Sequence, residues 1–121
     1  MVKNSKIIVA GGSGFIGANL ISDLISNGNE VISISKSAHN IKRKVDSARY
    51  IFHDLKQPIK QDLFKSFANV EYIINCSGYI DHSNFRNNGK EVYYEHFNSL
   101  ITLTNLAIDL NIKTFVQLGS S

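Results

Sequence analysis

The sequence contains one cysteine, Cys76, among 121 residues, and its uninterrupted apolar runs are short. A single cysteine excludes an internal disulfide bond and fits a reducing compartment, so we expect a cytoplasmic protein. No apolar run approaches the length that a helix needs to cross a bilayer. A charged-then-apolar leader is also missing, because the first apolar run has the character of a strand. We therefore expect no membrane partner.

Basic residues slightly outnumber acidic ones: 13 Lys and Arg against 10 Asp and Glu give a net charge of +3. The basic residues are not interleaved with aromatic residues as in a nucleic-acid-binding face, so we expect no nucleic-acid partner. The basic run 42–44 is either an anion contact or a solvated loop. His82 and His96 have no metal-ligand spacing with each other or with Cys76, so we expect no metal site.

Hydrophobic residues make up 43% of the chain, enough for one domain over residues 1–121 with a substantial core. Strand-like and helix-like segments alternate along it. We expect strands at 6–10, 31–35, 50–53, 70–76 and 113–118, with helices starting near 16, after Pro58 and at 91. This alternation predicts the α/β class: a doubly wound parallel sheet of order 3-2-1-4-5, with ligands beyond the carboxyl ends of its strands.

Helical spacing also predicts which side chains face the core. For the first helix, which Asn27–Gly28 should end, they are Ile16, Leu20, Leu24 and Ile25. For the short helix they are Leu63, Phe64 and Phe67. For the long helix over 91–111 they are Tyr93, Phe97, Leu100, Ile101, Thr104 and Ile108.

The most informative segment is 6–17, where apolar residues run into a glycine cluster and an amphipathic segment follows. This order ends a buried strand, turns tightly and opens a helix whose N-terminus faces an anion. Gly12, Gly14 and Gly17 satisfy G-x-G-x-x-G, and Gly11, Gly14 and Gly17 satisfy G-x-x-G-x-x-G. In this context the pattern predicts a dinucleotide-binding Rossmann domain rather than a glycine-rich turn without a ligand.

With Phe15–Ile16 before its last glycine, the second spacing resembles the extended short-chain dehydrogenase/reductase family, which includes NAD-dependent sugar epimerases and dehydratases. The resemblance covers nearly all of the chain, which corresponds to the first third or so of a typical member. It implies a nucleotide-sugar substrate and an NAD(P) cofactor, and it is compatible with a homodimer. The cofactor's pyrophosphate would be held by Gly11, Gly14, Phe15, Ile16 and Gly17.

The end of the second strand carries Ser35 and Lys36, where NAD-users of this fold normally place an Asp or Glu on the adenosine ribose. Without that carboxylate a 2′-phosphate is not repelled, and Lys36 can attract it. We therefore favour NADP slightly over NAD, with Lys42 and Arg43 as secondary candidates. The alternative is that Lys36 is a solvated surface charge.

Two further segments resemble cofactor-binding parts of the family. The segment 53–55 is similar to the one after the family's third strand, which implies that Asp54 and the backbone of Leu55 hold the adenine. The alternative is that Asp54 caps its own turn. The segment 75–78 is similar to the family's small-residue run, which implies packing against the nicotinamide ribose and phosphates by Cys76, Ser77 and Gly78.

Two segments resemble parts of the family's active site. Tyr94–Asn98 is similar to its long-helix pattern, which implies that Asn98 supports the active site. The segment 115–121 is similar to F-V-x-x-S-S, which implies that Ser120 hydrogen-bonds a substrate hydroxyl or carbonyl. Ser121 is the weaker candidate by register, and a polar strand end is the alternative. The family's Tyr-x-x-x-Lys pair is absent, because none of the five tyrosines has a lysine four residues later.

We therefore expect the NAD(P)-binding part of a nucleotide-sugar epimerase, dehydratase or reductase that acts by hydride transfer and is inactive alone. The alternative from another class is a non-catalytic NAD(P)-sensing module. A part of a longer enzyme is favoured over a free-standing module, because the fifth strand would otherwise be an unprotected sheet edge.

Overall fold

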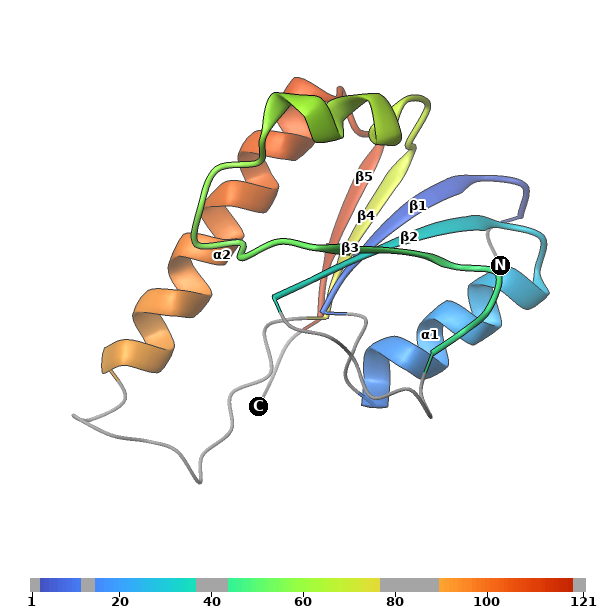
Figure 1. Cartoon of the computed structure of the whole chain (residues 1–121), viewed down its shortest axis with the longest axis horizontal. Helices are drawn as coiled ribbons and strands as arrows, with labels where there is room; N and C mark the ends of the chain where they lie inside the picture. The colour runs from blue at the N-terminus through green and yellow to red at the C-terminus, as the bar shows by residue number, and fades with distance from the viewer. Residues whose placement is uncertain (1–2, 12–14, 37–43, 77–89, 119–121) are drawn as a thin grey trace.

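The computed structural model describes residues 3–11, 15–36, 44–76 and 90–118, with the backbone alone for 90–96 (Figure 1). The elements, in chain order, are β1 (Lys6–Ala10), α1 (Phe15–Ser26), β2 (Glu30–Ser35), β3 (Arg49–Phe52), the 3-10 helix η2 (Gln61–Phe67), β4 (Tyr72–Asn75), α2 (Lys90–Asp109) and β5 (Thr114–Gln117). The strands and the two α-helices begin and end within a few residues of the bounds that the sequence predicts, and η2 follows Pro58 as expected.

The strands form one parallel sheet of order β3-β2-β1-β4-β5, so the predicted fold class and strand order are confirmed. Ala10 lies opposite both Ile34 and Asn75, and Asn75 lies opposite Gln117. Because the strands are parallel and in this register, their carboxyl ends are level along one edge of the sheet. From β1 the sheet grows on one side through β2 and β3, and then on the other side through β4 and β5. The direction of growth therefore changes beside β1.

Alternating side chains of the strands build a core on each face of the sheet. Ile8, Ile32 and Ile73 belong to a cluster with side chains from η2 and α2, and Ile7 and Val31 belong to a cluster with side chains from α1. Figure 1 shows the same division, with α2 and η2 on one side of the sheet and α1 on the other. Such a sheet, covered on both faces, explains the near-continuous apolar strands β1 and β2.

The inner face predicted for α1 is partly wrong. Leu24 is buried, and Leu20 and Ile25 pack at the edge of its cluster, but Ile16 is 56% exposed. Gly17 and Ala18 are buried in its place. A glycine at this position lets the helix approach the sheet closely, so the small side chains rather than Ile16 turn inward.

The inner face predicted for α2 is wrong. Leu103 and Leu106 are buried in the core, whereas Phe97, Ile101 and Ile108 are exposed. The helix carries apolar residues on two faces, and hydrophobic periodicity alone does not distinguish the inner one. For η2 the prediction is confirmed: Phe67 is buried, and Leu63 and Phe64 pack against the same cluster.

Turn residues close the end of α1 as predicted. Gly28 has φ +85°, and its N–H donates to the Ile25 carbonyl at 2.9 Å. A Cβ at Gly28 would lie 3.2 Å from Asn4 Oδ1, so a side chain would be both strained and crowded. The buried Asn29 then ties the turn to the sheet, because its Oδ1 accepts from Ser5 N–H at 3.0 Å and its Nδ2 donates to the Leu24 carbonyl at 2.9 Å.

The amino end of the sheet is held by Lys6 at the start of β1. Its Nζ donates to the Ala68 carbonyl at 2.8 Å and lies 3.5 Å from Glu30 Oε2. These contacts join β1 to β2 and to the connection before β4, on the edge opposite the carboxyl ends. Within the described ranges, no helix is both long and apolar enough to traverse a bilayer.

Candidate functional site

Hydrogen bonds extend the sheet one residue past the ends of several strands. Gly11 N–H donates to the Ile34 carbonyl at 2.8 Å, and Cys76 N–H donates to the Ala10 carbonyl at 2.8 Å. His53 N–H donates to the Ser35 carbonyl at 2.9 Å. These bonds bring segments from four separate parts of the sequence to one edge, which we call the carboxyl-end rim: residues 11, 35–36, 53–55 and 76.

The residues described on either side of the turn after β1 have two features that an anion site requires. Gly11 has φ +79°, a conformation that favours glycine. Helix α1 opens at Phe15, and its first turn contains no acidic side chain. The first amides of an α-helix have no carbonyl partner within the helix, and the positive end of the helix dipole adds to their attraction for a negative group. The described part of this turn therefore fits a diphosphate.

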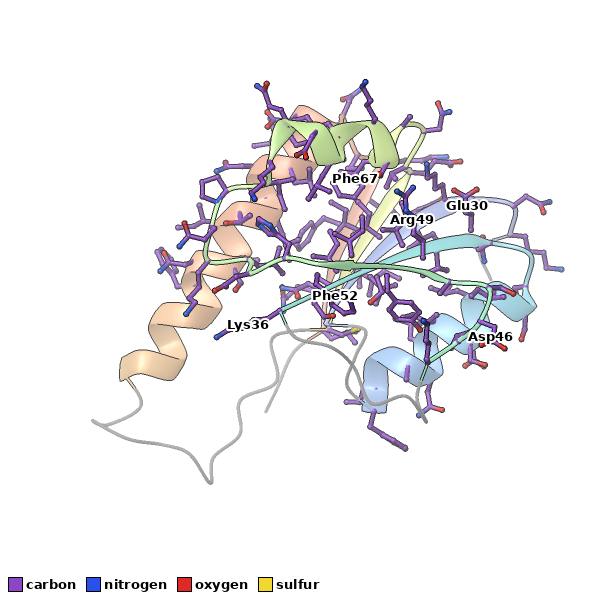
Figure 2. The ribbon with its side chains drawn as sticks, in the orientation of Figure 1. Glu30, Lys36, Asp46, Arg49, Phe52 and Phe67 are labelled. Atoms are coloured by element: carbon purple, nitrogen blue, oxygen red, sulfur yellow. The ribbon has the colours of Figure 1, made fainter. Side chains whose placement is uncertain are left out.

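The end of β2 offers a cation and no carboxylate. Ser35 is buried, whereas Lys36 is exposed at the rim. On the neighbouring strand Ser35 lies opposite Phe52, a residue that is 54% exposed at the end of β3. Figure 2 labels Lys36 and Phe52 at this edge. The sequence analysis did not single out Phe52, although an aromatic residue at the last position of a rim strand could have drawn attention to it.

Asp54 caps the turn after β3. Its Oδ1 accepts from the Lys56 N–H at 3.0 Å, and its Oδ2 lies 3.8 Å from Lys56 Nζ. This is the turn-capping role that the sequence analysis kept as the alternative. The next side chain, Leu55, is buried in the core. Among the described residues, no carbonyl is recorded as accepting a hydrogen bond from the Leu55 N–H.

His53 has a structural contact rather than the surroundings of a catalytic base. Its Nε2 lies 2.9 Å from the Gln57 carbonyl, and a ring N–H there donates to that oxygen. The contact closes the same turn that Asp54 caps. His53 therefore holds the connection after β3 in place.

The ends of β4 and β5 are joined by a pair of amide side chains. The buried Asn75 donates from Nδ2 to Gln117 Oε1 at 2.7 Å, and Gln117 Nε2 donates to the Leu118 carbonyl at 3.1 Å. Beside them, burial raises the pKa of the Cys76 thiol. The protonated thiol is a poor nucleophile, so Cys76 acts as a small packing residue. The sequence analysis did not predict this hydrogen bond of Gln117.

Asn98 lies on α2 beside the connection that follows β3. It lines a groove of about 360 Å³ between α2 and the segment 56–64, together with Lys56, Pro58 and Phe64. The structure therefore places Asn98 on the side of α2 that faces the connection after β3.

Several predicted site residues fall outside the described part of the chain. They are Gly14 in the glycine turn, Ser77 and Gly78 after β4, and Ser120 after β5. The secondary candidates Lys42, Arg43 and Ser121 also lie there. In the ranges that the structure does describe, no group of three or more His, Cys, Asp and Glu residues could hold a metal ion.

Comparison with known proteins gives one family and many similar folds. The model of the NAD-dependent epimerase/dehydratase family matches residues 7–121. An uncharacterized protein of Saccharomyces cerevisiae is 34% identical over 83 residues, which are 66% of this chain and 27% of the yeast protein.

Two solved structures show the extent of the common fold. UDP-glucose 4-epimerase from Thermotoga maritima, solved with UDP-glucose, superposes with a TM-score of 0.81 at 20% identity over 93% of this chain. UDP-glucose 4-epimerase from Bifidobacterium longum, solved with NAD+ and UDP, superposes with a TM-score of 0.82 at 18% identity over 97% of this chain. The chain spans 37% of the length of each enzyme.

Proposed function

The chain belongs to the NAD-dependent epimerase/dehydratase family, and from this premise we propose that residues 1–121 are the NAD(P)-binding part of an enzyme that acts on a nucleotide sugar. The observation that carries the proposal is the turn after β1. Gly11 at φ +79° leads into a helix whose first turn is free of acidic side chains. That arrangement suits a diphosphate, and the sheet's order reverses at the same point.

The proposed cofactor contacts follow the carboxyl-end rim. The diphosphate would lie against Gly11, Gly14, Phe15, Ile16 and Gly17, and the adenosine ribose against Ser35 and Lys36. Asp54 and the backbone N–H of Leu55 would hold the adenine. The nicotinamide ribose would pack against Cys76, Ser77 and Gly78. When bound, this cofactor accepts a hydride from the substrate and returns it.

We propose NADP as the preferred cofactor, by a small margin over NAD. Lys36 supports this choice because it is exposed at the end of β2, where a carboxylate would otherwise repel a 2′-phosphate. Phe52, which ends the neighbouring strand, offers an apolar surface beside the same position.

The reaction is proposed to be an epimerisation, dehydration or reduction of a nucleotide sugar. Ser120 would hydrogen-bond the reacting oxygen and Asn98 would support the site from α2. The 121-residue chain is proposed to be inactive alone, because no tyrosine in it has the lysine partner that would lower the phenol's pKa for proton transfer. The same absence favours a second candidate, a non-catalytic NAD(P)-sensing module.

The proposed assembly is a homodimer in the cytoplasm. The exposed apolar side chains of α2, Phe97, Ile101 and Ile108, support self-association. The unpaired thiol of Cys76 supports a reducing location.

Titration of the purified chain with NADPH and NADH, followed by the fluorescence of the reduced nicotinamide, tests the proposed function. We expect saturable binding of both and tighter binding of NADPH. Tighter binding of NADH would overturn the preference for NADP, and binding of neither would overturn the cofactor site. Epimerase or dehydrogenase turnover by the 121-residue chain would overturn the proposed inactivity.

A further inference from the structure

Three hydrogen bonds form a closed ring where β4 and β5 end. Asn75 donates from Nδ2 to Gln117 Oε1 at 2.7 Å, and Gln117 donates from Nε2 to the Leu118 carbonyl at 3.1 Å. The Leu118 N–H in turn donates to the Asn75 carbonyl at 3.1 Å. We call these three residues the amide ring. It joins one side chain of β4, one side chain of β5 and the backbone of both chain segments.

The end of β5 depends on the amide ring because β5 is an edge strand. In the described sheet β5 has one neighbour, β4, with which it pairs from Thr114 to Gln117 (Figure 1). Val116 and Leu118 are 38% and 37% exposed, so burial contributes little at this end. Strand ends with few buried contacts open most readily. The side chain of Gln117 therefore supports a segment that the backbone ladder alone would hold weakly.

The two amides of the ring are better suited to fixing a direction than to filling the core. Asn75 is 1% exposed, and a buried amide costs stability unless it has a hydrogen-bond partner. Two apolar side chains of the same shape would avoid that cost. An apolar pair cannot, however, fix the orientation of a peptide group. Glutamine can do so, because one of its amide atoms accepts a hydrogen bond and the other donates.

The peptide group that Gln117 orients is the one that leads out of β5. Its carbonyl belongs to Leu118 and its nitrogen belongs to residue 119. Because a peptide group is planar, the direction of this carbonyl sets the direction in which the chain continues. Residues 119–121 lie outside the described part of the chain, and among them is Ser120, the proposed contact of the reacting oxygen.

The amide ring lies on the half of the rim that the proposed function assigns to the nicotinamide. β4 and β5 are on one side of β1, whereas β2 and β3, which lead to Lys36 and Asp54, are on the other. Directly after Asn75, the Cys76 N–H donates to the Ala10 carbonyl at 2.8 Å. The ring is thereby joined to β1, and Ala10 directly precedes the glycine turn.

We propose that Gln117 is a positioning residue for the nicotinamide half of the cofactor and for the segment that contacts the reacting oxygen. It acts through Asn75 and the Leu118 peptide group rather than by touching either ligand. Gln117 occupies an unspecified position of the F-V-x-x-S-S pattern, so the resemblance assigns it no role. This inference rests on the proposed function and adds one residue to its site.

Binding of three ligands to variants of the 121-residue chain tests the inference. NADPH and NADH carry the nicotinamide, whereas ADP shares only the adenosine and diphosphate of these cofactors. Gln117→Met removes both side-chain hydrogen bonds at similar length and without a change of charge. Gln117→Glu retains the acceptor for Asn75 and loses the donor to the Leu118 carbonyl. The two variants therefore separate the two bonds.

We expect both variants to weaken binding of the reduced cofactors about three- to tenfold, because a neutral hydrogen bond has a modest net effect. ADP affinity should stay unchanged in Gln117→Met. The nicotinamide emission of NADPH should be enhanced and blue-shifted on binding to the wild type, and both variants should lose most of this change. Only Gln117→Met should clearly lower the urea midpoint, because it alone removes the acceptor from the buried Asn75 amide.

The charge of Gln117→Glu has its own controls. Repulsion of the diphosphate by the new carboxylate would weaken ADP and the reduced cofactors by the same factor, so the ratio of their affinities isolates the nicotinamide half. Gln61→Glu, at an exposed position on η2, makes the same change of residue away from the rim. It should bind all three ligands as the wild type does.

Three results would overturn the inference while the wild type binds its cofactor. They are unchanged nicotinamide binding and emission in both variants, an equal loss for ADP and cofactor in Gln117→Met, and a loss in Gln117→Met that Gln117→Glu does not share. The last result would mean that Gln117 contributes stability alone. A wild-type chain that binds none of the three ligands would instead overturn the proposed cofactor site, and this inference with it.

Discussion

The side-chain amide of Asn75, at the end of β4, donates a 2.7 Å hydrogen bond to Gln117 Oε1 on β5. Asn75 is 1% exposed, so water cannot readily replace its partner. Gln117→Ala should therefore lower the free energy of unfolding by about 1–2 kcal/mol. Urea denaturation measures the change. Lys113→Ala, at an exposed position just before β5, should stay within about 0.5 kcal/mol of wild type, and an equal loss in both variants would contradict the role of the amide pair.

Ile16→Glu should separate stability from cofactor binding. A carboxylate in the first turn of α1 interacts favourably with the helix dipole, so the free energy of unfolding should stay constant or rise by about 0.3–1 kcal/mol. The same charge would repel a diphosphate, which should weaken NADPH binding about tenfold. Ile16→Gln is the uncharged control. Unchanged affinity in the Glu variant would show that no anion binds at this turn.

Asp54→Asn should distinguish the two roles of Asp54. An asparagine oxygen can still accept from the Lys56 N–H, so the turn and the stability should be retained. The amide replaces the carboxylate that would receive the adenine amino group, so NADPH affinity should fall several-fold. Asp54→Ala should lose both stability and affinity. If the Asn variant binds as tightly as wild type, Asp54 is a turn residue only.

Lys36→Glu should reverse the cofactor preference. Loss of the cation and gain of a carboxylate should weaken NADPH binding about tenfold while NADH binding changes much less. Lys65→Glu, at an exposed position on η2, makes the same change in net charge away from the rim. Isothermal titration of both variants gives the affinities. Equal effects of the two substitutions would mean that Lys36 acts only through the overall charge of the protein.

The buried thiol of Cys76 should make stability fall in alkaline solution. Burial raises its pKa in the folded chain, so above about pH 8 the unfolded chain loses the proton first. The unfolded state is then favoured, and the free energy of unfolding should decrease as pH rises towards the folded pKa. Urea denaturation at several pH values, with Cys76→Ala as the control, measures this slope. A slope shared by both proteins would assign it to other groups.

The sheet and its rim could be predicted because they rest on strong local signals. The apolar run of β1, the glycine after it and the Asn27–Gly28 stop each have one structural interpretation. Once the strands are parallel, topology alone brings Gly11, Lys36 and Asp54 to one edge. The shared edge of these residues was thus predictable from the order of the elements rather than from any one residue.

The faces of the helices were harder to predict, for physical reasons. In α2 apolar residues lie on two sides, and no charged residue between Phe97 and Ile108 marks the side that meets water. In α1 the closest contact with the sheet is made by Gly17 and Ala18, which a search for large apolar side chains overlooks. Gln117 was missed because a polar residue on a strand suggests solvent, whereas here it binds a buried amide.

Lys6 anchors the edge of the sheet farthest from the glycine turn, through the Ala68 carbonyl and Glu30. Because these contacts lie at the opposite end of the strands from the carboxyl-end rim, we expect substitutions around them to change stability while the rim keeps its shape. Heat stability can then be adjusted at that end of the sheet, by evolution or by design, without a change to the residues of the rim.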